Sequence, residues 1–389
     1  MPTRSTRSRP RATTITDVAR EAGVSVASVS RVVNGHANVA PETRQRIIEV
    51  VDRLRYVPDT AARGLITRKS QMIGVLLPDV YGEFFSELIR GIDAGAREHQ
   101  LHLLLSSSHG DAAEMAAAIR AMHGRVEGLL VLAPQLDTTA LADLDTSVPT
   151  VFMNSRVGGR APSLAIDSYG GARAMVRHLL ACGHRSVAHI TGPIDNFDSH
   201  ERERGYRDEL AAARPPVRPQ VIRGDFTQTS GYAAGQALGA AAARPSAVFA
   251  ANDMMAIGCL AALAELGVAV PDDIAVAGFD DIPLAAFVRP GLTTMHVPIV
   301  ELGRGAVSRL AEYIARPESR AAAATLPTEL VIRESSGTTP ARVPSSSRPP
   351  RDGGPHDQPV QRNQPRTRGA RPAPPPSVSG RRRRARPRR

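Results

Sequence analysis

The sequence predicts an all-α unit at the N-terminus, an α/β body with two lobes, and a C-terminal tail that does not fold. Three observations carry this prediction. Apolar residues recur at helical spacing in three short segments within residues 14–57. From Met72 onward, short apolar runs alternate with longer amphipathic segments, which is typical of parallel sheets covered by helices. From Ser335 onward, Pro, Arg, Ser and Gly replace almost all large apolar residues, so this segment cannot bury a core.

The 389 residues carry a formal net charge of +11 that is spread unevenly. Residues 1–70 have a net charge of +7 and residues 335–389 have +12, which leaves −8 on residues 71–334. A basic N-terminal unit suits the phosphates of DNA, whereas an acidic body is repelled by them. The body is therefore expected to have a different partner. The arginine-rich tail adds either non-specific attraction to DNA or only a solvated polycation.

Several protein classes are disfavoured by the sequence. It contains no run of about 18 apolar residues that could span a membrane. The arginines of the first 14 residues are not followed by the apolar segment of a secretory signal. We therefore expect a cytoplasmic, nucleoid-associated protein without a membrane partner. Cys182 and Cys259 are not spaced as metal ligands, so we expect buried thiols and predict no metal and no cofactor.

Residues 14–33 predict two short helices joined by a turn. The first is expected to begin near Thr16, with Asp17 in its first turn, where a carboxylate suits the positive end of a helix. Gly23 can adopt the left-handed conformation that ends such a helix, and Ser25 can cap the next one. The second helix is expected to turn three valines inward, namely Val29, Val32 and Val33.

A third helix is expected at Pro41–Leu54, with Pro41 at its first position. Its apolar stripe consists of Ile47, Val50, Val51 and Leu54. Two short helices, a turn and a supporting third helix are typical of a helix-turn-helix, which places its second helix in the DNA major groove. On these residues alone, a three-helix bundle that only packs is the alternative.

The alternation of apolar runs and amphipathic segments in the body predicts two successive Rossmann-like parallel sheets with a cleft between them. In the first half, strands are expected at 72–80, 101–106, 128–133 and 149–154, with helices at 84–100, 112–123 and 136–144. The alternation starts again after Asp167. In the second half, helices are expected at 170–182, 201–213, 229–242 and 254–266, and strands at 187–191, 220–223, 247–250 and 274–279. A crossover near Thr293–Pro298 leads to one more helix at 300–314.

Several of these motifs occur in a specific order. The segments TITDVAREAGVSVASVSRVVNG and VAPETRQRIIEVVDRLRYVPDTAARGL, followed by the alternating body, resemble the LacI (lactose/galactose repressor) family of transcription regulators over roughly residues 14–334. The resemblance implies a helix-turn-helix domain that binds DNA and a periplasmic-binding-protein-like domain that binds a small effector.

With the patterns above, the resemblance gives a division of the chain. It comprises a basic arm at 1–13, the helix-turn-helix domain at 14–57, a hinge helix and linker at 58–70, the two-lobed body at 71–334 and the tail at 335–389. Within the body, the N-lobe is expected at about 71–166 plus 297–325, and the C-lobe at about 167–296 plus 326–334.

By this resemblance, Val26, Ala27 and Arg31 occupy the positions that meet base edges. Arg31 can donate two hydrogen bonds to one guanine, at O6 and N7. The apolar side chains of Val26 and Ala27 can contact thymine methyl groups. Short polar side chains of the same domain are expected to hold phosphates and set the register on DNA, namely Thr16, Ser25, Ser28, Ser30 and Asn34.

The segment Asp59–Leu65 resembles the family's hinge helix, which forms only on operator DNA. There Ala62 and Arg63 would lie in the minor groove and Leu65 would wedge between base steps. Two residues depart from the common pattern: Asp59 stands where Asn is usual, and Gly64 weakens a helix by about 1 kcal/mol relative to Ala. A plain linker is the alternative for this stretch.

The resemblance also places effector-binding residues at the carboxyl ends of strands, where open α/β sheets bind ligands. They are aromatic residues, amides, an arginine and a carboxylate: Phe84, Phe85, Asn154, Arg202, Phe226, Asn252 and Asp280. Such a set can bond sugar hydroxyls and cover the C–H face of the ring. A sugar is therefore the expected effector, with a nucleobase or nucleoside as the alternative. Each residue also has a purely structural alternative: Arg202 can pair with Glu201 or Glu203, and Asp253 is expected to cap the helix that begins at Met254.

An enzyme is not expected, because no G-x-S-x-G elbow, P-loop, H-E-x-x-H or strand-linked G-x-G-x-x-G motif occurs. The expected function is DNA-binding transcriptional regulation, with a repressor preferred, under control of a small-molecule effector. Two protomers would present their recognition helices to a pseudo-palindromic operator on double-stranded DNA. A homodimer is preferred to a tetramer, since the tail lacks the leucine heptads of the family's tetramers. Whether the effector releases or recruits the protein stays open.

Overall fold

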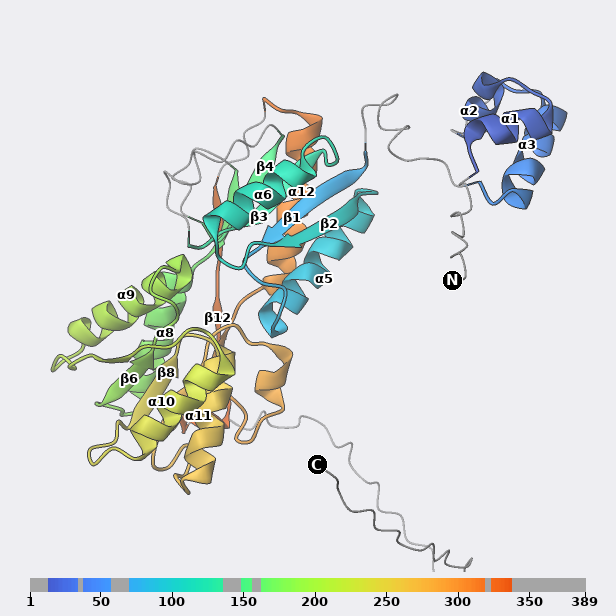
Figure 1. The fold of residues 1–389 in the computed structure, drawn as a ribbon. Coiled ribbons are helices and arrows are strands. Elements are labelled where there is room, and N and C mark those ends of the chain that lie inside the picture. The colour runs from blue at the N-terminus through green and yellow to red at the C-terminus, as the bar shows by residue number, and fades with distance from the viewer. Residues whose placement is uncertain are drawn as a thin grey trace, which may run out of the picture. The chain divides into compact units, whose positions relative to one another are not determined.

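The computed structural model describes residues 13–33, 38–56, 70–135, 148–155, 162–318 and 323–337. Within these ranges it confirms the predicted fold class: an α-helical N-terminal unit and an α/β body with two parallel sheets (Figure 1). None of the described helices is long and apolar enough to cross a membrane. The predictions for the helix at 136–144, for Asn34 and for the hinge residues Asp59, Ala62, Arg63, Gly64 and Leu65 lie outside the described residues.

The N-terminal unit consists of α1 (Ile15–Ala22), α2 (Val26–Val33) and α3 (Pro41–Arg53). Helix α1 begins one residue before the predicted Thr16, because Thr14 and Asp17 form a reciprocal capping box. Gly23 ends α1 at φ +64°, and the Ser25 hydroxyl accepts the Ser28 amide, both as predicted. The apolar faces of the three helices meet in a small core that includes Val18, Ala22, Val29, Val32, Ile47 and Val50.

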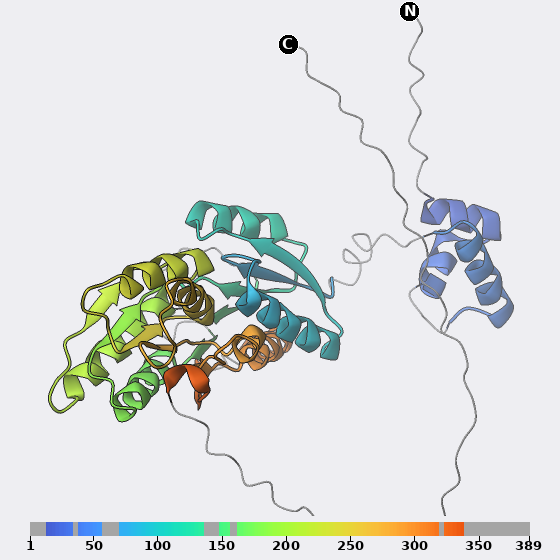
Figure 2. The ribbon, with the colours of Figure 1, turned by 90° about the horizontal axis from the view of Figure 1, so that it is seen from below.

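The first lobe contains a six-stranded sheet in the order β11-β5-β4-β3-β1-β2, with every neighbouring pair parallel. Its strands are β1 (Met72–Leu77), β2 (His102–Ser107), β3 (Gly128–Leu132), β4 (Thr150–Met153), β5 (Ser163–Ile166) and β11 (Ala324–Leu326). Helices α5 (Glu83–Glu98) and α12 (Ile299–Ala315) cover one face, and α6 (Ala112–Met122) covers the other (Figure 2).

Side-chain alternation along β1 fixes how these helices pack. Ile73, Val75 and Leu77 belong to the core that includes Leu88 of α5 and Leu302 of α12. Leu76 belongs instead to the core around Met115 of α6, because successive strand residues point to opposite faces of a sheet. Helices α5 and α12 cross so closely that a Cβ at Gly91 would lie 2.2 Å from the carbonyl oxygen of Val300.

The second lobe contains a four-stranded parallel sheet in the order β7-β6-β8-β9. Its strands are β6 (Val187–Ile190), β7 (Gln220–Ile222), β8 (Ala247–Ala250) and β9 (Ala275–Ala277). Helices α8 (Ser168–Ala181) and α9 (Phe197–Ala212) share one core with this sheet, and α10 (Gln228–Gly239) and α11 (Asp253–Glu265) share the other. Helix α9 begins four residues before the predicted Glu201, because the Asn196 side chain caps it by accepting the Ser199 amide.

Three connections join the lobes within the described residues. They run from β5 to α8, from β10 (Thr294–His296) to α12, and from β11 to β12 (Glu329–Val331). Strands β10 and β12 pair antiparallel, and short 3-10 turns lie at Pro283–Ala286 and Glu334–Ser336. The sequence did not predict the short strands β5, β10, β11 and β12, which flank these connections.

Candidate functional site

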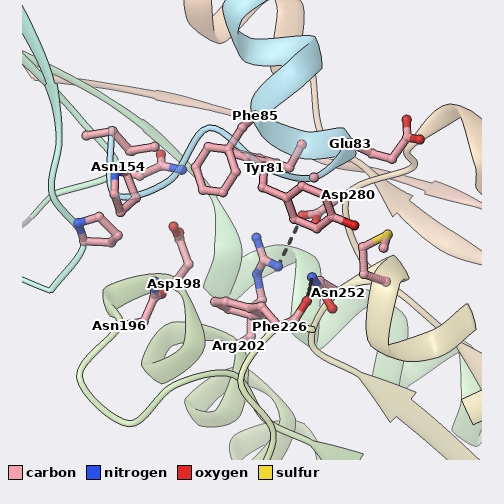
Figure 3. A pocket seen from close by; sticks show the side chains of 16 residues that line it. Tyr81, Glu83, Phe85, Asn154, Asn196, Asp198, Arg202, Phe226, Asn252 and Asp280 are labelled. Atoms are coloured by element: carbon pink, nitrogen blue, oxygen red, sulfur yellow. Dashed lines mark hydrogen bonds and ion pairs between the residues drawn. The ribbon is translucent and has the colours of Figure 1, made fainter. Parts of the chain in front are cut away.

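A cavity of about 140 Å³ lies between the two lobes (Figure 3). All seven residues predicted for the effector line it: Phe84, Phe85, Asn154, Arg202, Phe226, Asn252 and Asp280. The lining also includes residues that the sequence did not single out, among them Tyr81, Asn196, Asp198 and Met254. Within the described ranges, no cluster of His, Cys, Asp and Glu could hold a metal ion.

The carboxyl ends of the strands bring these residues together. In the first lobe, the β1–α5 loop leads to Phe84 and Phe85, and Asn154 directly follows β4. In the second lobe, Phe226 follows β7, Asn252 follows β8 and the chain after β9 leads to Asp280. All these strands are parallel to their sheet neighbours, so their carboxyl ends share an edge of each sheet and enclose one site.

Arg202 and Asp280 form a buried ion pair on the cavity wall (Figure 3). They are 3% and 5% exposed, and Arg202 Nη1 lies 3.2 Å from Asp280 Oδ1. Arg202 also donates to the Ala251 carbonyl and to Ser168 Oγ, and its guanidinium stacks 3.8 Å from the centre of the Phe279 ring. The alternative pairing of Arg202 with Glu201 or Glu203 is wrong, because those carboxylates pair with Arg204, Arg207 and Arg223 on the surface of the lobe.

Asp280 is incompletely satisfied. Its Oδ1 is buried and has no hydrogen-bond partner among the described residues, since the contact with Arg202 is an ion pair without hydrogen-bond alignment. Burial raises the pKa of Asp280 to about 7, although the positive charge of Arg202 acts in the opposite direction. A buried acceptor of this kind is stabilised by a donor that enters the cavity.

Three residues of the cavity wall have left-handed backbone conformations that non-glycine residues rarely adopt: Asn154 at φ +42°, Phe226 at +69° and Asp280 at +114°. Hydrogen bonds hold each of them. The Asn154 side chain accepts the Ile166 amide at 3.0 Å, Asn252 Nδ2 donates to the Phe226 carbonyl at 3.0 Å, and the Asp280 amide donates to the Met295 carbonyl at 2.9 Å. Strained backbone that surrounding bonds maintain is typical of ligand sites.

The predicted capping role of Asp253 is wrong. Helix α11 starts at Asp253, so Asn252 is the residue just outside it, and Asn252 Oδ1 accepts the Met255 amide at 3.0 Å. The amide of Asn252 is therefore engaged at both ends, and this residue shapes the cavity wall. Asp253 is fully buried and accepts the Thr294 hydroxyl at 2.6 Å and the Ile282 amide at 3.0 Å. Burial raises the pKa of Asp253 well above its ordinary value.

Asp198 is the main lining residue that sequence reasoning missed. It is 8% exposed and accepts the Ser168 hydroxyl at 2.8 Å, and burial raises its pKa. The hydroxyl of Ser168 in turn accepts from Arg202 Nε at 3.3 Å. The sequence signal that could have identified Asp198 is the N-cap of α9. Asn196 caps the amide of Ser199, three residues later, which places Asp198 in the first turn of the helix.

The predicted base-contacting residues share the outer face of α2. Val26, Ala27 and Arg31 are exposed, whereas Val29 and Val32 on the inner face are buried. Of the predicted phosphate-contacting residues, Thr16 and Ser25 are exposed and Ser28 and Ser30 are half-buried. The hydroxyls of Ser25 and Ser28 bond each other at 2.9 Å. The unit therefore presents one exposed helix face with an arginine at its last turn.

Comparisons with known proteins match both parts of the chain. Residues 14–59 match the model of bacterial regulatory proteins of the lacI family, and residues 176–336 match that of the periplasmic binding protein-like domain. Catabolite control protein A of Priestia megaterium is 34% identical over 327 residues, which cover 83% of this chain and 98% of that protein. The ribose operon repressor of Haemophilus influenzae is 31% identical over 325 residues, which cover 83% and 98%.

A solved structure supports the same similarity. The crystal structure of the lac repressor dimer bound to operator and the anti-inducer ONPF has a TM-score of 0.76 and 29% sequence identity. The match covers 84% of this chain and 99% of that one.

Proposed function

Because the chain belongs to the LacI family of bacterial regulatory proteins, we propose that it is a sequence-specific transcriptional repressor controlled by a small effector in the cavity between its lobes. The observation that carries this proposal is the cavity itself. It combines the buried ion pair of Arg202 and Asp280 with amides and aromatic rings from both lobes. We propose regulation rather than catalysis, in the cytoplasm on the nucleoid.

The N-terminal unit is the proposed DNA-binding domain. Arg31 would bond a guanine in the major groove, and Val26 and Ala27 would contact thymine methyls. Phosphates would be held by Thr16, Ser25, Ser28, Ser30 and Asn34, while Ala62, Arg63 and Leu65 would act in the minor groove. Two copies of the chain would bind the two halves of a pseudo-palindromic operator as a homodimer, for which the lac repressor dimer on its operator is the precedent.

A sugar is the proposed effector. Its hydroxyls would donate to Asp280 and accept from Arg202 and Asn154, and an aromatic side chain such as Phe226 would cover a C–H face of the ring. The ribose operon repressor, one of the relatives, is named for a sugar operon. The division of the body into lobes at about 71–166 plus 297–325 and 167–296 plus 326–334 is part of this proposal.

The effector would act through the arrangement of the lobes. Phe84 and Asn154 come from one lobe, and Arg202 and Asp280 come from the other, so one ligand contacts both. A ligand that binds one lobe arrangement more tightly shifts the population toward it. The shift would change how the two DNA-binding domains of a dimer are held, which couples cavity and operator as two linked sites.

The decisive experiment selects duplexes from a random DNA library with the full chain and then titrates the selected duplex with sugars and nucleosides. We expect an enriched inverted repeat and an effector that changes its affinity severalfold. Recovery of DNA without any enriched sequence, or an affinity that no cavity ligand changes, would contradict the proposal.

A further inference from the structure

The charges around the cavity are unbalanced. Among the described lining residues, the carboxylates are Glu83, Asp198 and Asp280, and the guanidinium of Arg202 is their single cationic counterpart. Asp198 and Asp280 are both buried. The described part of the cavity wall therefore has more acidic than basic side chains.

The guanidinium of Arg202 already has protein partners at Nε and Nη1. It forms the ion pair with Asp280, donates to the Ala251 carbonyl and to Ser168 Oγ, and stacks on the Phe279 ring. A phosphate or carboxylate that entered the cavity would compete with Asp280 for the positive charge of Arg202 and weaken the pairing of that buried carboxylate. Leaving a buried charge unpaired is strongly unfavourable.

The N-terminus of α9 does not supply a second anion site. Its first turn already contains the carboxylate of Asp198, and the Asn196 side chain accepts the Ser199 amide. The positive end of the helix is thus offset by the chain's own negative charge, on the side that faces the cavity. An external anion would meet Asp198 at this place, and like charges in a buried site repel each other.

An uncharged ligand with several hydroxyl groups meets none of these penalties. Its O–H groups can donate to Asp280 Oδ1, which accepts no hydrogen bond from the described residues, and to the carboxylate of Asp198. We propose that the cavity selects uncharged, hydroxyl-rich effectors against their phosphorylated or acidic derivatives, and that Asp198 is the residue that sets this selection. The inference rests on the proposed function in taking the cavity as the effector site.

Matched ligand series test the inference on the full chain. Each series contains a neutral sugar, its phosphate ester and its acid: glucose, glucose 6-phosphate and glucuronate; galactose, galactose 6-phosphate and galacturonate; ribose, ribose 5-phosphate and ribonate. Affinities are obtained from ligand-dependent thermal shifts, because a ligand that binds only the folded state stabilises it. We expect a neutral sugar to bind at least about tenfold more tightly than its two anionic derivatives.

The variant Asp198→Asn keeps the shape of the side chain and removes its charge. We expect the preference for neutral over anionic members to shrink about tenfold or more in this variant. The matched control is Asp195→Asn, which removes an exposed carboxylate three residues away that does not line the cavity; its preference should equal that of the unmodified chain. A purely structural effect of Asp198→Asn would weaken neutral and anionic ligands alike and leave their ratio unchanged.

Each outcome has a defined meaning. An anion that binds the unmodified chain as tightly as its neutral parent, or an unchanged ratio in Asp198→Asn, overturns the inference. If no neutral sugar of the series binds, an anion response gained only by Asp198→Asn still supports it, and no response in either protein overturns it. If an anion binds as tightly as its neutral parent and alters operator affinity, the charge inference fails while the proposed function stands. If neutral sugars bind without effect on DNA, the proposed function fails and the charge selection stands.

Discussion

Asp280 and Asp281 are consecutive in the chain, yet their carboxylates have different partners. Asp280 lies in the cavity wall, 3.2 Å from Arg202 Nη1. Asp281 Oδ1 accepts from Arg333 Nη2 at 2.7 Å, and its Oδ2 lies 3.0 Å from His296 Nδ1. His296 ends β10, which leads into the connection to α12, and Arg333 follows β12, into which the connection from β11 leads. A ligand that contacts Asp280 is therefore one residue away from Asp281, which contacts both His296 and Arg333.

Removal of the Asp280 carboxylate should uncouple the effector from DNA. We expect Asp280→Ala to weaken effector binding by about 1.5–3 kcal/mol, the range for hydrogen bonds to a charged group. Operator affinity without effector should not change, because Asp280 belongs to the body. Fluorescence anisotropy of labelled operator, titrated with effector, measures both quantities. The control is Asp272→Asn, an exposed carboxylate outside the cavity lining; an intact effector response in Asp280→Ala would refute the site.

Effector affinity should depend on pH through Asp280. Hydroxyl donors favour the ionised carboxylate, so the effector binds the deprotonated form more tightly and lowers the pKa of Asp280 from about 7. Affinity should therefore rise as the pH rises from 6 to 8, and well below pH 7 it should fall by up to about tenfold per pH unit. Isothermal titration at several pH values measures the slope. If effector affinity depended on pH with the same slope in Asp280→Asn, the pH dependence would arise from other titratable groups.

His189 should make the body sensitive to acid. It is fully buried, Nδ1 donates to the Phe249 carbonyl at 2.8 Å, and the ring stacks between Tyr206 and Phe249. Burial lowers its pKa from 6.5 to about 4, so the folded state binds fewer protons than the unfolded state in this window. Its stabilising contribution is present above pH 6.5 and declines by about 3 kcal/mol as the pH falls to 4.

Urea unfolding between pH 7 and pH 4 measures this decline. The variant His189→Phe keeps a ring between its neighbours and should show a smaller fall in unfolding free energy across the window, whatever its stability at pH 7. The exposed His200 supplies the control, since His200→Gln should keep the full decline. Identical pH dependence in all three proteins would show that His189 does not contribute.

Arg31 should discriminate between operator and random DNA. We expect Arg31→Ala to cost about 1–3 kcal/mol on the selected operator and to relax the preference at one base pair. The matched change is Arg53→Ala, which removes an arginine that pairs with Glu21 on the surface of the same domain. Arg53→Ala should change the affinity for operator and for random DNA by the same factor. Equal losses on both DNAs for Arg31→Ala would mean that Arg31 contacts phosphate only.

Alanine substitutions at Gly192 and Gly231 should have different effects, one on effector binding and the other on the stability of the fold. A Cβ at Gly192 would lie 2.3 Å from the end of the Phe226 ring, which is half-buried and can move. Gly192→Ala should therefore displace the ring and weaken effector binding with little change in unfolding temperature. A Cβ at Gly231 would lie 2.1 Å from the Met255 carbonyl oxygen, where backbone must shift.

We expect Gly231→Ala to lower stability by about 1–3 kcal/mol, the range for overpacking. Thermal unfolding and effector titration of both variants test the contrast. A large loss of stability in Gly192→Ala would show that the Phe226 ring is fixed in place.

The sequence predicted the fold class well because each lobe's main strands are apolar runs separated by amphipathic helices. It predicted seven residues of the cavity lining through the family resemblance, and the structure brings all seven to one cavity. It could not predict the left-handed backbone at Asn154, Phe226 and Asp280, because bonds between segments distant in sequence hold these conformations. Asp198 was missed, and Asp253 was wrongly predicted to cap α11, for a different reason. Their roles depend on where α9 and α11 begin, and a helix boundary depends on a single capping contact.

The three connections between the lobes have a consequence for how the body can be cut. Because the described chain passes between the lobes after β5, after β10 and after β11, neither lobe is one continuous stretch of sequence. A gene fragment that ends after β5 would encode a first lobe without α12 and β11, which complete its sheet and its core. Conversely, proteolytic cleavage of any one connection would leave the lobes tethered by the other two. A protein cleaved once, in one of these three connections, would keep its two lobes together and retain both halves of its ligand site.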